Sequence, residues 1–198
     1  YQAYYHEEML KTFAVRPFLW STHVWNMFDF AADARDEGGV KGMNNKGLVT
    51  YDRKQKKDSF YLYKAYWNKE EKFVWIASKR FVEREQETIK VGVYTNLDKV
   101  TLTQNGVEVA TVDAVDHKAV FEVELVDGEN KFVATSGEYK DEAVFVKVDS
   151  NNNKYVCPNA ASDSVTNWFD DTGKEVKLNL PEGYLNVNVP ICDYVESP

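Results

Sequence analysis

The feature that most constrains this chain is a change in hydrophobic period near Trp67. Beyond that point apolar and polar residues alternate, as in TIKVGVYT, which is the period of a β-strand with one buried face. About seven short segments of this kind follow one another, and Asn105-Gly106 between two of them is typical of a tight hairpin. This spacing predicts an immunoglobulin-like β-sandwich over residues 68–148, so the fold class is expected to be mainly β.

The N-terminal part, residues 1–67, has a different pattern. Apolar residues recur at helical spacing up to Phe13, and Pro17 then interrupts the helix. The apolar run FLWSTHVWNMFDFAA, residues 18–32, is predicted to be a strand, and after a Gly-containing loop Asp58 is placed to cap a second helix. An αβα order of this kind suits the remnant of a (β/α)₈ barrel, in which functional side chains follow the strands.

The last part, residues 149–198, begins with the polar, turn-prone sequence DSNNNK. We interpret it as a linker and a partial C-terminal segment that is too short for a core of its own. It contains both cysteines, Cys157 and Cys192, which lack the CxxC spacing of metal or redox sites. Two free thiols and one structural disulfide are both compatible with this pattern.

The charge balance excludes several classes of protein. The chain has 32 acidic and 24 basic residues, a formal net charge of −8, which argues against binding to nucleic acid or to anionic membranes. No apolar run approaches the roughly eighteen residues that a membrane span needs. The three histidines are far apart and no carboxylate set suits a hard cation, so neither a metal site nor a cofactor is predicted.

Two long phrases of the N-terminal part resemble glycoside hydrolase family 2, in its β-galactosidase and β-glucuronidase group. WSTHVWNMFDFAADARDEGG and GMNNKGLVTYDRKQKKDSFYLYKAYW look like the final barrel strand, loop and helix of that family. The likeness continues more weakly into the sandwich, at VYTNLDKVTLTQNGVEV. The resemblance implies a retaining hydrolase of carbohydrate metabolism that removes terminal β-linked galactose. The alternatives are β-glucuronidase specificity and a non-catalytic sandwich that binds carbohydrate or protein, for which Trp75 and Trp168 are the candidate aromatic contact residues.

The resemblance also implies where a sugar would bind. Trp25 takes the position of the family tryptophan that lies under the sugar in the cleavage subsite, and Asn26 follows it on the strand. An indole face suits the C–H face of a pyranose. The alternative is a core tryptophan packed beside Trp20.

Asn44 and Lys46 reproduce a second pattern of the family. In the β-glucuronidases an N-x-K pair holds the carboxylate of the sugar acid, a charge-assisted contact that a neutral galactoside would not supply. The alternative is a lysine of an ordinary loop that is solvated or pairs with an acid such as Asp52.

The remaining polar residues are assigned supporting or surface roles. Salt bridges that position the loop are expected from Asp29, Asp33, Arg35, Asp52 and Arg53. A structural hydrogen bond is expected for His23, a surface position for His6 and His117, and a solvated helix face for Glu7 and Glu8.

No catalytic residue is predicted within this segment. The family uses two glutamates about 5 Å apart, and the resemblance places both on barrel strands that precede Tyr1. The segment alone is therefore expected to be inactive. Its expected partners are a β-galactoside or β-glucuronide and the upstream barrel and sandwich domains of a longer parent. The apolar faces of a lone barrel remnant would pack on the sandwich or on a second copy of the chain.

Overall fold

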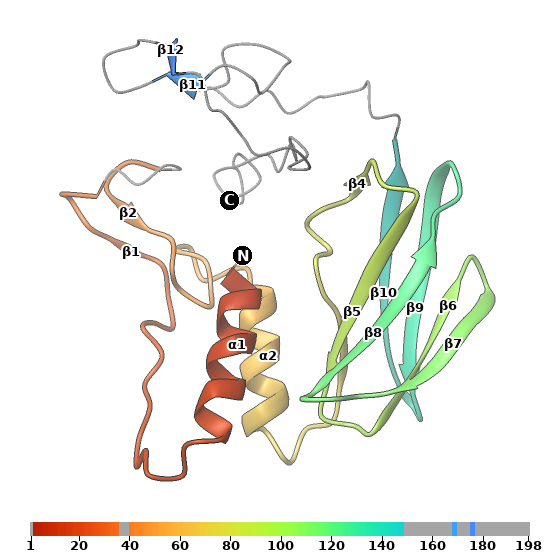
Figure 1. Cartoon of the computed structure of the whole chain (residues 1–198), viewed down its shortest axis with the longest axis horizontal. Coiled ribbons are helices and arrows are strands. Elements are labelled where there is room, and N and C mark those ends of the chain that lie inside the picture. Colours follow the sequence, from red (N-terminus) through yellow and green to blue (C-terminus); the bar gives the residue numbers. More distant parts are fainter. Residues whose placement is uncertain (1, 36–39, 149–167, 170–174, 177–198) are drawn as a thin grey trace. The chain divides into compact units, whose positions relative to one another are not determined.

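The computed structural model describes residues 2–35, 40–148, 168–169 and 175–176 (Figure 1). The chain divides into two compact units, one formed by Tyr1–Arg35 with Gly42–Ser150 and one by Asp36–Lys41 with Asn151–Pro198. The described strands of the second unit are β11 (Trp168–Phe169) and β12 (Glu175–Val176), which pair antiparallel. The rest of the predicted C-terminal segment, including Cys157 and Cys192, lies outside the described residues.

Two helices belong to the first unit, α1 (Gln2–Ala14) and α2 (Asp58–Trp67), and they pack against each other (Figure 1). Leu10 of α1 and Leu62 of α2 are buried in the same apolar cluster. Both helices were expected from the spacing of apolar residues, and both are present.

The start of α2 differs from the prediction. Asp58 is the first helical residue, and Lys57 occupies the cap position without a side-chain cap bond. The Asp58 carboxylate instead accepts hydrogen bonds from Trp75 Nε1 at 3.0 Å and from the backbone nitrogen of Ser78 at 2.8 Å. These hydrogen bonds compete with helix capping, because they use the same two oxygens of the Asp58 carboxylate that a cap would use.

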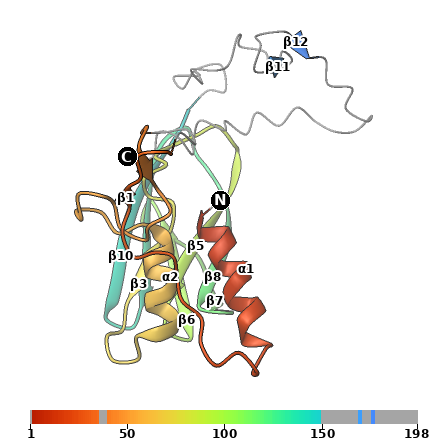
Figure 2. The same cartoon turned by 90° about the vertical axis from the view of Figure 1, so that its left-hand side faces the viewer.

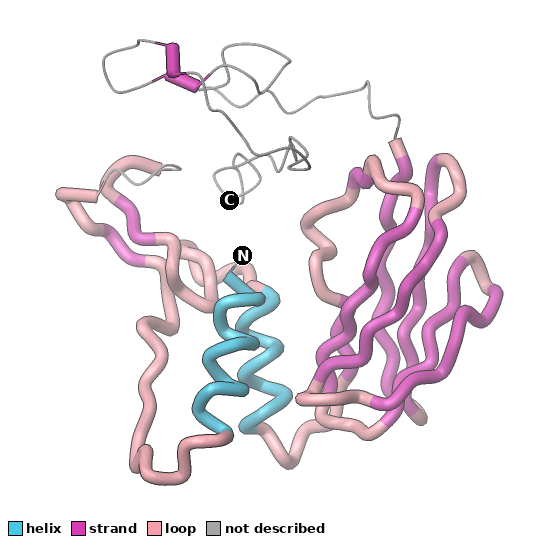
Figure 3. Tube along the Cα trace, in the orientation of Figure 1, coloured by secondary structure: helices cyan, strands magenta, loops and turns pink. Residues whose placement is uncertain are grey.

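Two sheets form the predicted sandwich (Figure 3). The small sheet has the order β3 (Val74–Ile76), β5 (Thr88–Thr95), β8 (Lys118–Glu124). The large sheet has the order β4 (Glu83–Arg84), β10 (Tyr139–Lys147), β9 (Gly128–Ser136), β6 (Lys99–Gln104), β7 (Val107–Asp113). β4 pairs parallel with β10, and the other pairs are antiparallel. The mainly β, sandwich-like fold class is confirmed.

The hairpin predicted at Asn105-Gly106 is also present, between β6 and β7. Asn105 has a φ of 51° and Gly106 a φ of 83°. Two consecutive residues with positive φ are what a tight hairpin with the native strand twist requires, and Asn-Gly is the pair that adopts them with least strain.

The small sheet is covered on both faces. Val91 and Val93 of β5 face the sandwich interior, where they join a cluster that includes Phe132 and Phe145 of the large sheet. The next residue, Tyr94, belongs to the second cluster, which contains residues of both helices. In the turned view the helices lie in front of this sheet (Figure 2). Successive side chains of one strand therefore hold two different apolar clusters together.

The apolar run of residues 18–32 does not form the long strand that was predicted. Its strand is only β1 (Phe30–Ala31), which pairs antiparallel with β2 (Met43–Asn44), and Phe28 forms an isolated bridge with Val49. The side chains of Phe18, Leu19, Trp20, Trp25 and Met27 are exposed. A barrel strand obtains hydrogen bonds and apolar contacts from neighbouring strands along its whole length, whereas the described residues pair with this run only at its C-terminal end, through β2 and the residues around Val49.

Candidate functional site

The candidate site lies on the segment from Trp25 to Lys57, and Asp29 is its structural centre. Asp29 is buried, and its Oδ1 atom accepts a hydrogen bond from Gly47 N at 2.8 Å and an ion-paired hydrogen bond from Lys57 Nζ at 2.8 Å. Its backbone nitrogen donates to Val49 O at 2.9 Å. Asp29 thus has the loop-positioning role that the sequence suggested, because one carboxylate joins three parts of the segment.

Gly47 is positioned by this contact. A Cβ atom built on residue 47 would lie 2.1 Å from the backbone nitrogen of Asp29 and 2.2 Å from the carbonyl carbon of Phe28. Both are backbone atoms that cannot move aside. Only glycine fits where the two chain segments approach so closely.

Lys57 completes the support. Besides Asp29 its ammonium donates to Asn45 O at 2.8 Å, so it ties the start of α2 to the loop. Burial lowers the pKa of Lys57, and this effect outweighs the raising effect of the bond to Asp29. The ion pair therefore carries a desolvation cost, and removal of either charge would leave the other poorly compensated.

Asn44 has a donor without an acceptor. The residue is 2% exposed, and its Oδ1 atom accepts a hydrogen bond from Lys46 N at 2.9 Å. Its Nδ2 atom is buried and has no hydrogen-bond partner in the part of the chain that the structure describes. An unsatisfied buried donor costs about 1–3 kcal/mol, so an acceptor supplied by a ligand would relieve that cost.

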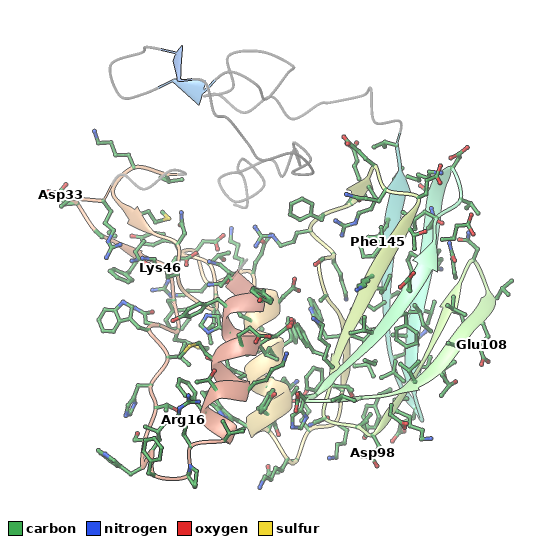
Figure 4. The ribbon with its side chains drawn as sticks, in the orientation of Figure 1. Arg16, Asp33, Lys46, Asp98, Glu108 and Phe145 are labelled. Atoms are coloured by element: carbon green, nitrogen blue, oxygen red, sulfur yellow. The ribbon has the colours of Figure 1, made fainter. Side chains whose placement is uncertain are left out.

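Lys46 lies on the loop between β2 and α2, where its side chain is exposed (Figure 4). The Asp52 carboxylate accepts from Thr50 Oγ1 at 2.6 Å and from Lys54 N at 3.1 Å, and the alternative that Lys46 pairs with an acid stays a prediction. The hydroxyl of Thr50, followed by the amide of Lys54, holds the pKa of Asp52 below its usual range. Arg53 also belongs to this support, since it donates to Asp29 O at 3.2 Å.

Trp25 and Asn26 come from the other side of the segment. Trp25 is 72% exposed, and its ring meets the ring of Phe30 edge-on at 6.1 Å, so it is not a core residue among the described parts. Asn26 Oδ1 accepts from Phe28 N at 2.8 Å, and the peptide bond between Trp25 and Asn26 is cis. Because Phe30 also pairs with Asn44 across β1 and β2, Trp25 and Asn44 flank the same residue.

The structure corrects two expectations on α1. His6 is 8% exposed rather than at the surface, and its Nδ1 atom lies 2.9 Å from the hydroxyl of Tyr63. Burial lowers the pKa of His6 and raises the pKa of Tyr63 to about 12. Glu7 binds Lys118 Nζ at 2.8 and 2.9 Å and accepts a hydrogen bond from the hydroxyl of Tyr94.

Both corrections have a signal in the sequence. His6 precedes the buried Leu10 by four residues, and Glu7 precedes it by three, so both share its helix face. Glu8 lies elsewhere on the helix and is exposed, as expected, where it pairs with Lys11 at 2.8 Å.

The other two histidines each contact one neighbouring polar group. His117 is half-buried rather than at the surface, with Nδ1 at 3.2 Å from Thr95 O, and the exposed His23 lies 2.8 Å from Ser21 Oγ. Across the described ranges no group of three or more His, Cys, Asp or Glu residues could hold a metal ion. A helix of membrane-spanning length and hydropathy was not found in that part of the chain either.

Helices α1 and α2, the short strands between them and the sandwich resemble the C-terminal part of glycoside hydrolases of the β-glucuronidase and β-galactosidase group. The comparisons confirm this resemblance, since the chain's homologues are enzymes of that group. No family model matches the chain.

Two curated relatives are β-glucuronidases. That of Bacteroides fragilis is 46% identical over 132 residues, which cover 66% of this chain and 19% of the relative. The putative β-glucuronidase of Formosa agariphila is 40% identical over 86 residues, which cover 41% of this chain and 10% of the relative. The chain thus spans less than a fifth of the length of either curated relative.

Two solved structures each cover 75% of this chain with 23% of their own length. One is the FMN-binding β-glucuronidase of Facaelibacterium prausnitzii L2-6, at 50% identity and a TM-score of 0.71. The other is a putative β-galactosidase of Bacteroides fragilis, at 36% identity and a TM-score of 0.69. Solved structures described as a β-glucuronidase and as a putative β-galactosidase therefore share this fold.

Proposed function

We propose that this chain supplies the C-terminal part of a retaining glycoside hydrolase that removes terminal β-linked glucuronic acid. The proposal depends on Asn44, whose Nδ2 atom is a buried donor without a partner among the described residues. The Lys46 amide holds the Asn44 oxygen, so that the other end of the amide is left for a ligand acceptor. A sugar carboxylate is such an acceptor, and the ammonium of Lys46 would add a charge-assisted contact.

The other site residues have complementary roles in this proposal. The exposed indole of Trp25 offers a flat apolar face to the sugar ring, and Asn26 holds the turn that follows it. Asp29, Gly47 and Lys57 do not touch the sugar. They fix the loop that carries Asn44 and Lys46, which limits the freedom that sugar binding would otherwise remove.

The arrangement of the longer parent is part of the same proposal. Residues 1–67 would be the end of a (β/α)₈ barrel, and residues 68–148 the sandwich that follows it. The acid/base and nucleophile glutamates would come from earlier barrel strands. The exposed side chains of residues 18–28 would then contact those strands, and the present segment alone would be inactive.

A β-galactosidase is the second candidate, and it is the specificity that the sequence alone favoured. One solved relative at 36% identity is described as a putative β-galactosidase. In that case the Asn44 amide would donate to a neutral hydroxyl and Lys46 would contribute little.

A non-catalytic sugar-binding sandwich has weaker support. Trp75, the candidate aromatic residue on the sandwich, stacks on Tyr61 with ring centroids 3.5 Å apart, and its Nε1 atom is bonded to Asp58. Its ring face is thus already occupied. The side chain of Trp168, the other candidate, lies outside the described atoms.

The experiment compares hydrolysis of 4-nitrophenyl β-D-glucuronide and β-D-galactoside by the parent enzyme that includes the upstream barrel. We expect the glucuronide to be preferred. Lys46→Gln should lower kcat/KM for the glucuronide about 100-fold and leave the galactoside rate nearly unchanged, because only the acidic sugar loses a charged contact. Trp25→Ala should lower both rates. Lys54→Gln is the matched control, because Lys54 is an exposed lysine of the same loop.

Two other results would favour a different function. A preference for the galactoside that Lys46→Gln leaves intact would establish the second candidate. If the parent hydrolyses neither compound, the binding-module alternative takes precedence.

A further inference from the structure

The path of the chain between the two sheets opens a cavity in the sandwich. The outer strand of the small sheet, β3, stays paired with β5 only as far as Ala77. The backbone nitrogen of Ala77 donates to Gly92 O at 2.8 Å. The chain then leaves β5 and joins the large sheet at β4, so β5 continues towards Thr88 without a neighbour on that side. The gap is a cavity of about 300 Å³, which is within the range of small-molecule sites.

The lining of this cavity is cationic although the chain as a whole is acidic. Within the sequence EREQET, residues 83–88, Arg84, Gln86 and Thr88 line the cavity, and the three glutamates are not among its lining residues. Lys90 adds a second cation, and its cross-strand neighbour Glu122 on β8 does not line the cavity. Among the described residues that line the space, two are cationic and none carries a carboxylate.

The guanidinium of Arg84 is held in a fixed position. It donates from Nη2 to Ser78 O at 2.9 Å, and its Cζ atom lies 4.5 Å from the ring centroid of Phe145 and 5.3 Å from that of Phe81. Figure 4 labels Phe145 on the large sheet. A planar guanidinium fixed on an aromatic ring is suited to bind an oxyanion, because little side-chain freedom is lost on binding.

The carbonyl that holds Arg84 belongs to a residue with a strained backbone. Ser78 has a φ of 63°, in the left-handed region that side chains other than glycine disfavour, and its nitrogen is bonded to Asp58 Oδ2. Strain of this kind costs of order 1–3 kcal/mol and is found most often at ligand sites. Here it places the Ser78 side chain at the cavity.

Four polar groups at the cavity have no hydrogen-bond partner among the residues that the structure describes. They are the hydroxyl groups of Ser78 and Thr88, the amide of Gln86 and the ammonium of Lys90, none of which bonds to another described residue. Ile89 supplies an apolar wall beside them, whereas Phe145 is buried beneath the Arg84 guanidinium.

We propose that this cavity binds a small organic oxyanion, a carboxylate or phosphate ester attached to an apolar body about the size of one ring. Arg84 and Lys90 neutralise the charge, the amide and hydroxyl groups bind its oxygen atoms, and the body lies against Ile89. The proposal is independent of the glycosidase activity, because none of these residues belongs to the segment from Trp25 to Lys57.

The test is a titration of the ¹⁵N-labelled 198-residue chain, followed by backbone amide shifts. The probes are phenyl phosphate and benzoate, with benzyl alcohol as the neutral analogue. We expect saturable shifts confined to the amides of residues 77–90 with at least one of the two anions, and none with the alcohol. Comparison of the two anions distinguishes a phosphate site from a carboxylate site.

The decisive variant is Lys90→Gln, because Lys90 is exposed and its replacement leaves the core intact. It should weaken anion binding about tenfold or more, the loss of one charge-assisted contact. The matched control is Lys99→Gln, an exposed lysine of β6 that is not in the cavity lining. Equal affinities in both variants, equal shifts with benzyl alcohol, or unsaturated shifts spread over many lysines would overturn the proposal.

Discussion

Gly47 packs directly on the backbone of Asp29, so that a Cβ on residue 47 would lie 2.1 Å from Asp29 N. The same two residues share a hydrogen bond of 2.8 Å from Gly47 N to Asp29 Oδ1. The position of the Asn44–Lys46 loop therefore depends on the Asp29 carboxylate and on the absence of a side chain at residue 47.

Gly47→Ala is expected to lower the free energy of unfolding by about 2–4 kcal/mol, because the added methyl overlaps backbone atoms that cannot move aside. Urea unfolding of the 198-residue chain measures this. Gly42→Ala is the control. Gly42 has a φ of 73° but open space around it, so only conformational strain of about 1 kcal/mol is expected. Equal losses in the two variants would contradict the close approach.

Asp29→Asn is expected to cost about 3 kcal/mol, since it leaves the buried ammonium of Lys57 without its counter-charge. The loss should show as a lower urea midpoint with little change in slope. Asp52→Asn, at an exposed acid of the same loop, should cost less than about 1 kcal/mol. If Asp29→Asn is as mild as Asp52→Asn, the carboxylate does not organise the segment.

A double-mutant cycle of Glu7→Gln and Lys118→Met should give a coupling energy of about 1–3 kcal/mol. The pair is largely shielded from water, and the carboxylate also accepts a bond from the Tyr94 hydroxyl. The comparison cycle is Glu8 with Lys11, an exposed pair on the same helix, for which about 0.3–0.5 kcal/mol is expected. A coupling no larger than that of the exposed pair would show that α1 is not tied to β8 by charge.

Protonation of His6 is expected to destabilise the protein. Burial lowers the folded-state pKa of His6 below the unfolded value of 6.5, so the folded state binds fewer protons in that interval. The contribution is fully present above pH 6.5 and is lost as pH falls from there through the lowered pKa. Its slope cannot exceed about 1.4 kcal/mol per pH unit.

Urea unfolding at several pH values between about 7.5 and 5 measures that slope. His6→Gln should remove this part of the pH dependence, whereas His23→Gln, at an exposed histidine, should follow the unaltered protein. A chain whose stability is unaffected by His6→Gln at every pH would show that His6 is not buried in the neutral form.

Much of the fold could be predicted from local pattern. The sandwich follows from alternating residues such as Val91 and Val93, and the β6–β7 hairpin from Asn105-Gly106, because both signals come from near neighbours in sequence. The pattern of residues 18–32 misled for a physical reason. A high apolar content indicates that a segment has to be buried. It does not indicate whether the strands that would bury it belong to the same polypeptide.

The candidate site residues also divide into those that the sequence predicts and those that only the tertiary structure reveals. Trp25, Asn44 and Lys46 are predicted from long sequence phrases, and the structure adds that the Asn44 Nδ2 atom has no partner among the described residues, which no sequence pattern reports. The partners of Glu7 and Asp58 could not be foreseen, since Lys118, Tyr94, Trp75 and Ser78 are distant in sequence. The cavity beside Lys90 depends on where one strand changes sheets, which is a property of the tertiary fold.

The two-sided burial of β3 and β5 limits how freely this sandwich can be exchanged between enzymes. If the sandwich were fused to a different barrel, the outer face of its small sheet would still be complementary to α1 and α2. Trp75 and Tyr94 would then need new partners for a stacked ring and for a buried hydroxyl. A successful graft would therefore have to carry α1 and α2 with the sheets, so the smallest transferable piece is larger than the domain that strand patterns delimit.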